Sequence, residues 1–166
     1  MQLPPFPRSL ARLITVLPAW PASRAFAAGC NLAAWPALKE LDWDHVRGRR
    51  FCVVVKDMGL RLYFSIHVDG FRAERNGLAD VTFTATAQDL ARLALRLEDP
   101  DTLFFNRRLL IEGDTDLGLT VKNMLDNLEL DVLLQGMPTP AAAALRLARN
   151  VLERETLASL MATPQK

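Results

Sequence analysis

Few side chains in the sequence could carry acid–base chemistry, because the 166 residues include only two histidines. A general acid or base must lie within hydrogen-bond reach of a reacting group and be oriented by a partner. His45 follows Asp44 in a predicted loop, and His67 falls in the polar register of a predicted strand. Neither position suggests a catalytic pair, so we interpret both histidines as structural or solvated residues.

The cysteines and the acidic residues also lack the spacing of a catalytic or metal site. Cys30 and Cys52 are far apart, with no histidine or second cysteine at metal-ligand spacing beside either. Glu112, Asp114 and Asp116 could surround a cation, but they span a predicted strand-to-helix turn, where acidic residues stabilise the start of a helix. We therefore expect no catalytic residue, no metal and no cofactor.

The composition disfavours several other classes of protein. The chain is 50% hydrophobic and 23% charged, with a formal net charge of only +1. The basic runs at 47–50 and 107–108 lack the interleaved aromatic residues of an RNA-binding motif, so no nucleic-acid partner is expected. The sequence has no Gly-rich phosphate loop, no Gly-x-Ser-x-Gly elbow and no apolar run long enough to span a bilayer. The unpaired cysteines favour a reducing cytoplasm.

Alternating apolar residues predict a sheet in the middle of the chain. Phe51 to Val55 is an unbroken β-branched and aromatic run, and residues 60–68 alternate between apolar and polar. The turn pairs Asp69-Gly70 and Asn76-Gly77 predict that 71–75 and 78–86 continue the sheet as an antiparallel four-strand meander. A fifth strand is predicted over 108–112. The fold class is therefore α+β, with a mostly antiparallel sheet of about five strands.

Helices are predicted on both sides of this sheet region. Thr86, with Asp89 three residues on, predicts a helix start, and this helix should end near Asp99-Pro100. Asp114 or Thr115 should cap another helix that runs to about Leu128. We expect amphipathic helices in 1–41, where Pro36 should interrupt the second helix near Trp35, a core domain in 42–131 and a helical extension in 132–166.

The first predicted helix, over residues 7–17, has the features of a membrane-surface helix. The opening 39 residues contain four basic residues and no acidic one, and Arg12 interrupts the apolar run, which disfavours a signal peptide. Apolar residues at helical spacing, flanked by a tryptophan, favour contact with a lipid interface. The predicted membrane-contact residues are Leu10, Leu13, Ile14, Leu17 and Trp20.

A longer motif carries a family resemblance. Residues 99–126, DPDTLFFNRRLLIEGDTDLGLTVKNMLD, combine an apolar patch, a strand, a Gly-Asp turn and an apolar helix. This order resembles the C-terminal half of the sterol carrier protein type-2 fold, and within that family it is similar to accessory factors of bacterial ubiquinone biosynthesis. The resemblance implies a sheet with helices packed around an apolar lipid tunnel, and no catalytic residue carries over.

The resemblance also implies a function, in which a non-catalytic factor supports oxygen-independent ubiquinone synthesis. Such a factor would bind the polyprenyl tail of quinone intermediates, or a phospholipid, and present it to partner hydroxylation proteins, in the cytoplasm or peripherally on the inner membrane. Two alternatives stay open, a filled core without a tunnel and a protein–protein interaction module without lipid. The predicted lipid-lining residues are Leu62, Phe64, Ile66, Phe83, Leu103, Phe104, Phe105, Leu117, Val121, Met124 and Leu125.

Overall fold

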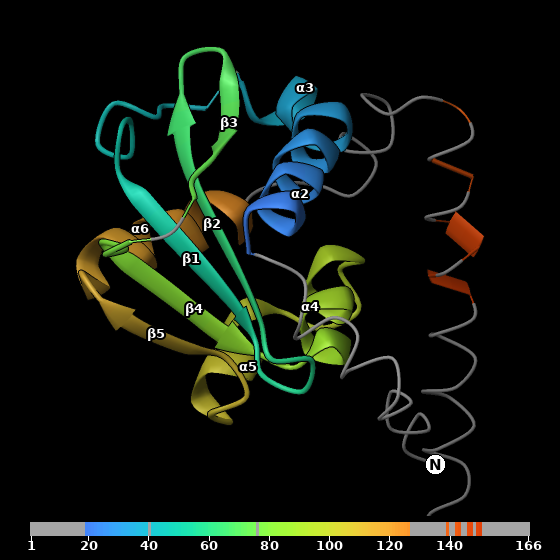
Figure 1. The fold of residues 1–166 in the computed structure, drawn as a ribbon. Coiled ribbons are helices and arrows are strands. Elements are labelled where there is room, and N and C mark those ends of the chain that lie inside the picture. Colours follow the sequence, from blue (N-terminus) through green and yellow to red (C-terminus); the bar gives the residue numbers. More distant parts are fainter. Residues whose placement is uncertain are drawn as a thin grey trace, which may run out of the picture.

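The computed structural model describes residues 19–39, 41–75 and 77–126, together with a few positions between 139 and 150. The strands are β1 (Arg50–Val55), β2 (Leu60–His67), β3 (Gly70–Ala73), β4 (Val81–Ala85) and β5 (Leu110–Gly113) (Figure 1). The helices are α2 (Ala19–Ala33), α3 (Trp35–Leu38), α4 (Ala87–Ala94), α5 (Pro100–Phe105) and α6 (Thr115–Asp126). The predicted helix over 7–17 and most of the predicted extension 132–166 lie outside the described residues.

The five strands form one sheet in the order β3-β2-β1-β4-β5, which confirms the predicted α+β fold and its mostly antiparallel sheet. The predicted meander is wrong, because β4 does not pair with β3. It pairs in parallel with β1 instead, with Phe51 opposite Val81. A turn dipeptide such as Asn76-Gly77 fixes only the local direction of the chain, whereas the pairing partner is decided by how the apolar face of the whole sheet is buried.

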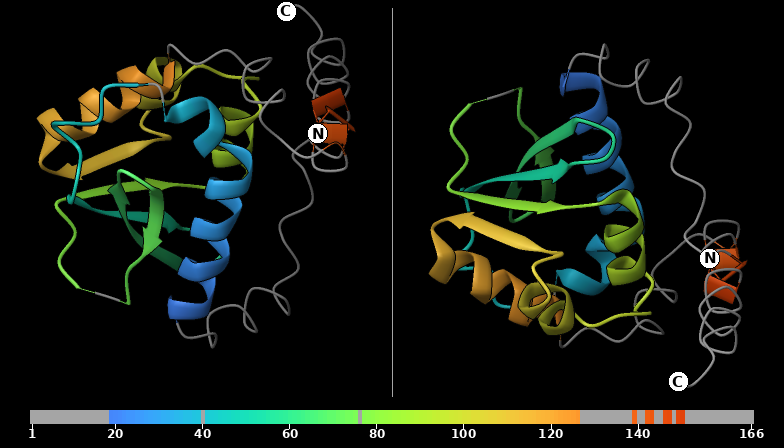
Figure 2. Two further views of the ribbon diagram at one scale, coloured as in Figure 1. Left: turned by 90° about the horizontal axis from the view of Figure 1, so that it is seen from above. Right: turned by 90° about the horizontal axis from the view of Figure 1, so that it is seen from below.

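Inward-facing side chains form rows across the sheet, because residues paired in register share a face, and two of these rows concern the site. In the first row Phe64 of β2 lies opposite Phe51 of β1, which lies opposite Val81 of β4. The second row consists of Leu62, Val53, Phe83 and Ile111 from β2, β1, β4 and β5. Helix α2 contacts β2 and β3, and α6 contacts β4 and β5. In both views of Figure 2, α6 lies along β5 and α2 lies apart from it, and side chains of both helices pack in one core.

Helix α2 also covers the free edge of β3. The side-chain amide of Asn31 donates to the carbonyl oxygen of Phe71 (2.8 Å) and accepts from its N–H (2.7 Å). The side chain thus replaces a neighbouring strand at that residue. As expected from Pro36, the helix is interrupted at Ala34, and the short helix α3 starts at Trp35 with Pro36 in its first turn, where no N–H is needed.

The caps of α4 and α5 confirm one prediction and correct another. Thr86 caps α4: its Oγ1 accepts from the N–H of Asp89 (3.1 Å) and donates to the Asp89 carboxylate (2.7 Å). Asp99-Pro100, however, starts a helix and does not end one. Asp99 accepts from the N–H of Thr102 (2.7 Å), and hydrogen bonds from Thr102 lower the pKa of Asp99. Asp-Pro fits a helix start because proline at the first position needs no N–H partner.

The β5–α6 turn packs closely on the strand beside it. Gly113 has a φ of +91°, and a Cβ there would lie 2.3 Å from the carbonyl oxygen of Asp80. Asp114 then caps α6 as predicted, accepting from the N–H of Leu117 (3.1 Å), and its other oxygen binds Arg49. At Gly118 a Cβ would lie 2.4 Å from the side chain of Ile111, so this turn of α6 lies directly against the sheet.

Candidate lipid-binding site

The first row of the sheet lies at the centre of a packed aromatic cluster. Phe64 has three ring partners, with centroid distances of 5.2 Å to Phe26 of α2, 5.5 Å to Phe51 of β1 and 5.7 Å to Phe71 of β3. Such tilted and offset pairs add to the stabilisation from buried area. The buried members of this cluster, which we call the main core, are Leu38, Trp43, Val46, Phe51, Phe64, Ile66, Val81, Leu117 and Val121.

The second row is buried less completely than the first. Val53 and Phe83 are only half-buried, although β1 and β4 are interior strands of the sheet, and Ile111 of the edge strand β5 is half-buried as well. In a filled core, the inward side chains of interior strands should be the most deeply buried ones. We call Val53, Phe83 and Ile111 the open row. Its partial exposure marks a part of the inner face that the helices leave incompletely covered.

A second, smaller cluster adjoins the open row. Ala85, Leu103 and Leu109 are buried there, with the half-buried Leu90 and Leu93 of α4 packed against them. Phe83 packs against both clusters and therefore lies at the boundary between them. Half-buried apolar side chains of the sheet (Phe83) and of α4 (Leu90 and Leu93) therefore lie around the same small cluster.

The predicted lining residues fall into three groups. Leu62, Phe64, Ile66, Leu103, Leu117 and Val121 are buried, while Phe83 and Met124 are half-buried and packed against the main core. Phe104 and Phe105 are surface residues, 37% and 79% exposed, because α5 presents only Leu103 and Pro100 to the interior. The side chain of Leu125 lies outside the described part of the structure, as do Leu10, Leu13, Ile14 and Leu17 of the predicted membrane helix.

Several aromatic residues of the main core are missing from the predicted lining. Phe51 and Phe71 belong to the same face, since Phe51 pairs with Phe64 and Phe71 pairs with Ile66. Aligning the paired residues across the two predicted hairpins would have placed Phe51 and Phe71 on the same face as Phe64 and Ile66. Phe26 and Trp35 contact the core from helices, and Trp35 packs edge-on against Phe71 at 6.1 Å. Their contribution depends on helix placement, for which the sequence has no local signal.

The outer face of the sheet holds a serine, a histidine and a glutamate in contact. Ser65 Oγ lies 2.7 Å from Glu74 Oε1 and 3.0 Å from His67 Nε2. A carboxylate only accepts, so the single hydroxyl proton points to Glu74, and the serine oxygen accepts from the Nε2–H of His67. His67 therefore cannot take a proton from Ser65, and Ser65 is only 2% exposed. This order of hydrogen bonds holds β2 to the end of β3 and does not activate a nucleophile.

The thiols are not activated either. Burial raises the pKa of Cys30 to about 12. Burial also raises the pKa of Cys52, against smaller opposing effects from Tyr63 and Arg61. A cysteine reacts as its thiolate, so both side chains stay protonated and weakly nucleophilic near neutral pH. Among residues 19–39, 41–75 and 77–126, no three histidine, cysteine, aspartate or glutamate side chains are grouped to hold a metal ion.

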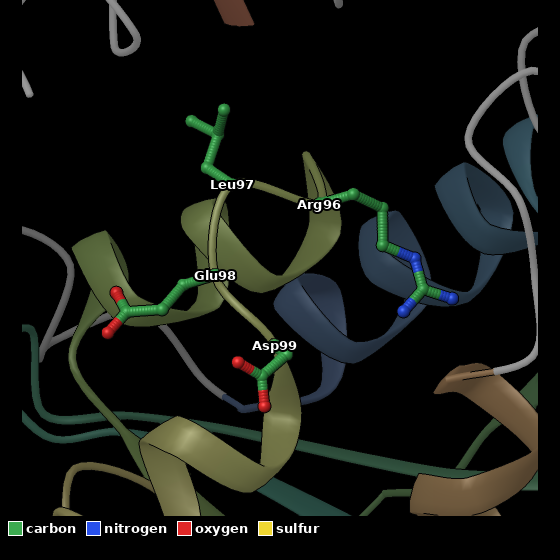
Figure 3. Close-up of a pocket in the computed structure, with 4 residues that line it drawn as sticks. All are labelled: Arg96, Leu97, Glu98 and Asp99. Carbon is green, nitrogen blue, oxygen red and sulfur yellow. The ribbon is translucent and has the colours of Figure 1, made fainter. Parts of the chain in front are cut away.

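An open cavity of about 390 Å³ lies at the turn between α4 and α5, lined by Arg96, Leu97, Glu98 and Asp99 (Figure 3). Its acidic groups already have structural partners. Glu98 pairs with Arg92 (3.3 Å) and with Arg108, which also binds the buried Asp89, while Asp99 caps α5. Figure 3 shows Arg96 and Glu98 extending in opposite directions from the turn. This charged, open cavity does not resemble an apolar lipid tunnel.

Comparison with known proteins identifies the family to which the chain belongs. Residues 34–126 match the SCP-2 sterol transfer family, so the chain belongs to that family. The matched range contains all five strands and the helices α3 to α6, and it includes both the main core and the open row. The predicted resemblance to this family is thereby confirmed.

Within the family, the chain is similar to a particular group of proteins. It is 45% identical over 95 residues to the ubiquinone biosynthesis accessory factor UbiT of Escherichia coli strain K12, and equally to UbiT of Escherichia coli O157:H7. The match covers 57% of this chain and spans about half, 55%, of those relatives. The solved structure of a UbiJ-SCP2 ubiquinone synthesis protein superposes with a TM-score of 0.51 at 23% identity, covering 63% of this chain and 93% of that one, which supports the fold.

Proposed function

We propose that the chain is a non-catalytic lipid carrier that holds the polyprenyl tail of a quinone intermediate, or a phospholipid, at the open row. The observation that supports this most directly is the half-buried state of Val53 and Phe83 on the two adjacent interior strands β1 and β4. The tail would lie over these two residues, with Leu90 and Leu93 of α4 beside it. The head of the lipid would stay accessible to other proteins.

The apolar surface is sufficient for such binding without polar contacts. Burying about ten tail carbons contributes roughly 8 kcal/mol, at about 0.8 kcal/mol for each methylene. The close contact of α6 with the sheet at Gly118 leaves no room for a tail there. We therefore assign the tail to the boundary between the two clusters, and not to the interior of the main core.

The hydroxylation chemistry would belong to partner proteins. Ser65 and His67 are arranged as structural hydrogen-bonding residues, and both thiols stay protonated. The similarity to UbiT, an accessory factor by name, agrees with a supporting role. We propose that the carrier presents the quinone ring to pathway hydroxylation proteins in the absence of oxygen.

The full chain purified from cells should release isoprenoid quinone or phospholipid on organic extraction, as measured by mass spectrometry. Phe83→Trp should fill the open row and lower the lipid content several-fold, with little change in melting temperature, because the site has spare volume. Phe105→Trp makes the same change at an exposed ring and should leave the lipid content unchanged. A wild-type protein without extractable lipid, or a Phe83→Trp variant strongly destabilised by overpacking, would favour a filled core.

We further propose a peripheral membrane contact through the predicted helix over 7–17. The structure describes no helix that is long and apolar enough to cross a bilayer among residues 19–39, 41–75, 77–126 and the described positions beyond. The full chain should float with anionic liposomes, and a chain lacking residues 1–17 should float less, because apolar area and two arginines are removed. Equal flotation of the two chains would reject a contact by this helix.

A further inference from the structure

The start of α2 carries two arginines over one tryptophan ring. The Cζ atoms of Arg24 and Arg75 lie 5.9 and 5.3 Å from the centroid of the Trp20 ring. Both arginines are exposed, and Trp20 is half-buried. We call these three residues the Trp20 cluster. Cation–π contacts of this kind hold each guanidinium near the indole while leaving its N–H donors available.

The backbone N–H and carbonyl group of one residue in β2, Tyr63, bring the two arginines together. The N–H of Tyr63 donates to Ser23 Oγ of α2 (2.9 Å), and its carbonyl oxygen accepts from the N–H of Glu74 (2.8 Å). Arg24 directly follows Ser23 in the sequence, and Arg75 directly follows Glu74. The position of the cluster is therefore fixed by the sheet edge and does not depend on flexible side chains alone.

The positive charge of the cluster is not compensated within the described part of the chain. No carboxylate there forms an ion pair with Arg24 or Arg75, and α2 contains no acidic residue. The acid next to Arg75, Glu74, is bound to Ser65 instead. Two like charges held beside one ring repel each other unless an anion lies between or above them.

We propose that the Trp20 cluster binds phosphate groups of anionic phospholipids at a bilayer surface. Guanidinium groups bind phosphate oxygens in pairs of hydrogen bonds, and tryptophan favours the interface between head groups and hydrocarbon. This inference rests on the peripheral membrane contact proposed above and adds two arginines, Arg24 and Arg75, to the predicted contact residue Trp20. It is independent of whether the open row carries a lipid tail.

Binding of the full chain to phosphatidylcholine vesicles with and without phosphatidylglycerol tests the proposal. Arg24→Gln/Arg75→Gln should weaken binding to the anionic vesicles by roughly 30-fold at low ionic strength, because each guanidinium near such a surface is worth about fivefold. Arg47→Gln/Arg107→Gln changes the net charge equally and should have a much smaller effect. Thermal unfolding of both double variants should match that of the wild type.

Tryptophan fluorescence gives a second readout on the same samples. Trp43 is buried and Trp35 packs in the main core, so a blue shift on anionic vesicles should come from Trp20 and disappear in Trp20→Phe. Equal weakening in the two double variants, or no preference of the wild type for phosphatidylglycerol, would overturn the proposal. Displacement from the cluster by inorganic phosphate at millimolar concentration would also overturn it, in favour of a site for free phosphate. Loss of binding on deleting residues 1–17, with no effect of the arginine changes, would support only the N-terminal helix.

Discussion

A strain whose only copy of the gene carries Leu90→Asp should lose ubiquinone during anaerobic growth, at least about tenfold, and keep it in air. Leu90 of α4 is half-buried and packs, like Phe83, against the second cluster. An aspartate there would place a carboxylate beside the proposed tail, and a charge that faces an apolar ligand costs several kcal/mol. Quinone extracted from cells grown with and without oxygen measures the effect, with a gene deletion as the reference for complete loss.

Three matched variants separate a carrier from an enzyme. Ala94→Asp introduces the same residue at an exposed position of α4 and should keep the anaerobic quinone at wild-type levels. His45→Ala and His67→Ala should also keep it, because the hydrogen bonds of His67 are structural. Loss of quinone in the histidine variants alone would show that the chain is an enzyme and not a carrier.

The sequence predicts the local features of this fold well. The period-two pattern of residues 60–68 correctly places Leu62, Phe64 and Ile66 on the buried face, because alternation along a strand needs no knowledge of its neighbours. The apolar set departs from the pattern at Val68, which lies past the end of β2 and is 70% exposed, and the polar set departs from it at Ser65, which is 2% exposed. The caps at Thr86 and Asp114 are equally local and equally correct.

The features that the sequence does not predict depend on contacts between distant segments. The parallel pairing of β1 with β4 is decided by the burial of the whole sheet, so a turn signal between β3 and β4 misassigns it. Phe104 and Phe105 belong to an apolar run, but α5 turns them outward. The difference between the main core and the open row is also non-local, because the coverage of Phe83 depends on where α4 and α6 lie.

The difference in burial between the main core and the open row decides which substitutions can test a lipid site. Phe64 and Leu117 both look like lining residues in the sequence, and a charged residue at either position would be a natural test. The structure places both in the packed main core, where a charge would unfold the protein and remove any activity. Residues at the boundary between the two clusters, such as Phe83 and Leu90, can report on a bound lipid while the fold is kept.

Truncating Phe64 to alanine should lower the free energy of unfolding by about 3–5 kcal/mol, the range for a phenylalanine in a packed core. Its ring contacts Phe26, Phe51 and Phe71, which come from three different elements, so the cavity cannot close by a single side-chain movement. Urea unfolding of the full chain, stripped of lipid, measures the loss. Phe105→Ala removes the same atoms from an exposed ring and should change the stability by no more than about 0.5 kcal/mol.

Phe83→Ala should lower the free energy of unfolding of the lipid-free protein less than Phe64→Ala does. The difference between the two variants tests whether Phe83 belongs to the lipid site or to the packed main core. Phe83 and Phe64 both face the interior from interior strands, and Phe83 is the less buried of the two. Because the open row already lacks part of its packing, its truncation should cost clearly less than that of Phe64. Adding back extracted lipid should then stabilise the wild type more than Phe83→Ala, since the tail loses its contact with the ring. If the two truncations cost the same and lipid stabilises neither protein, the second row is as tightly packed as the first, and the inner face has no lipid site at Phe83.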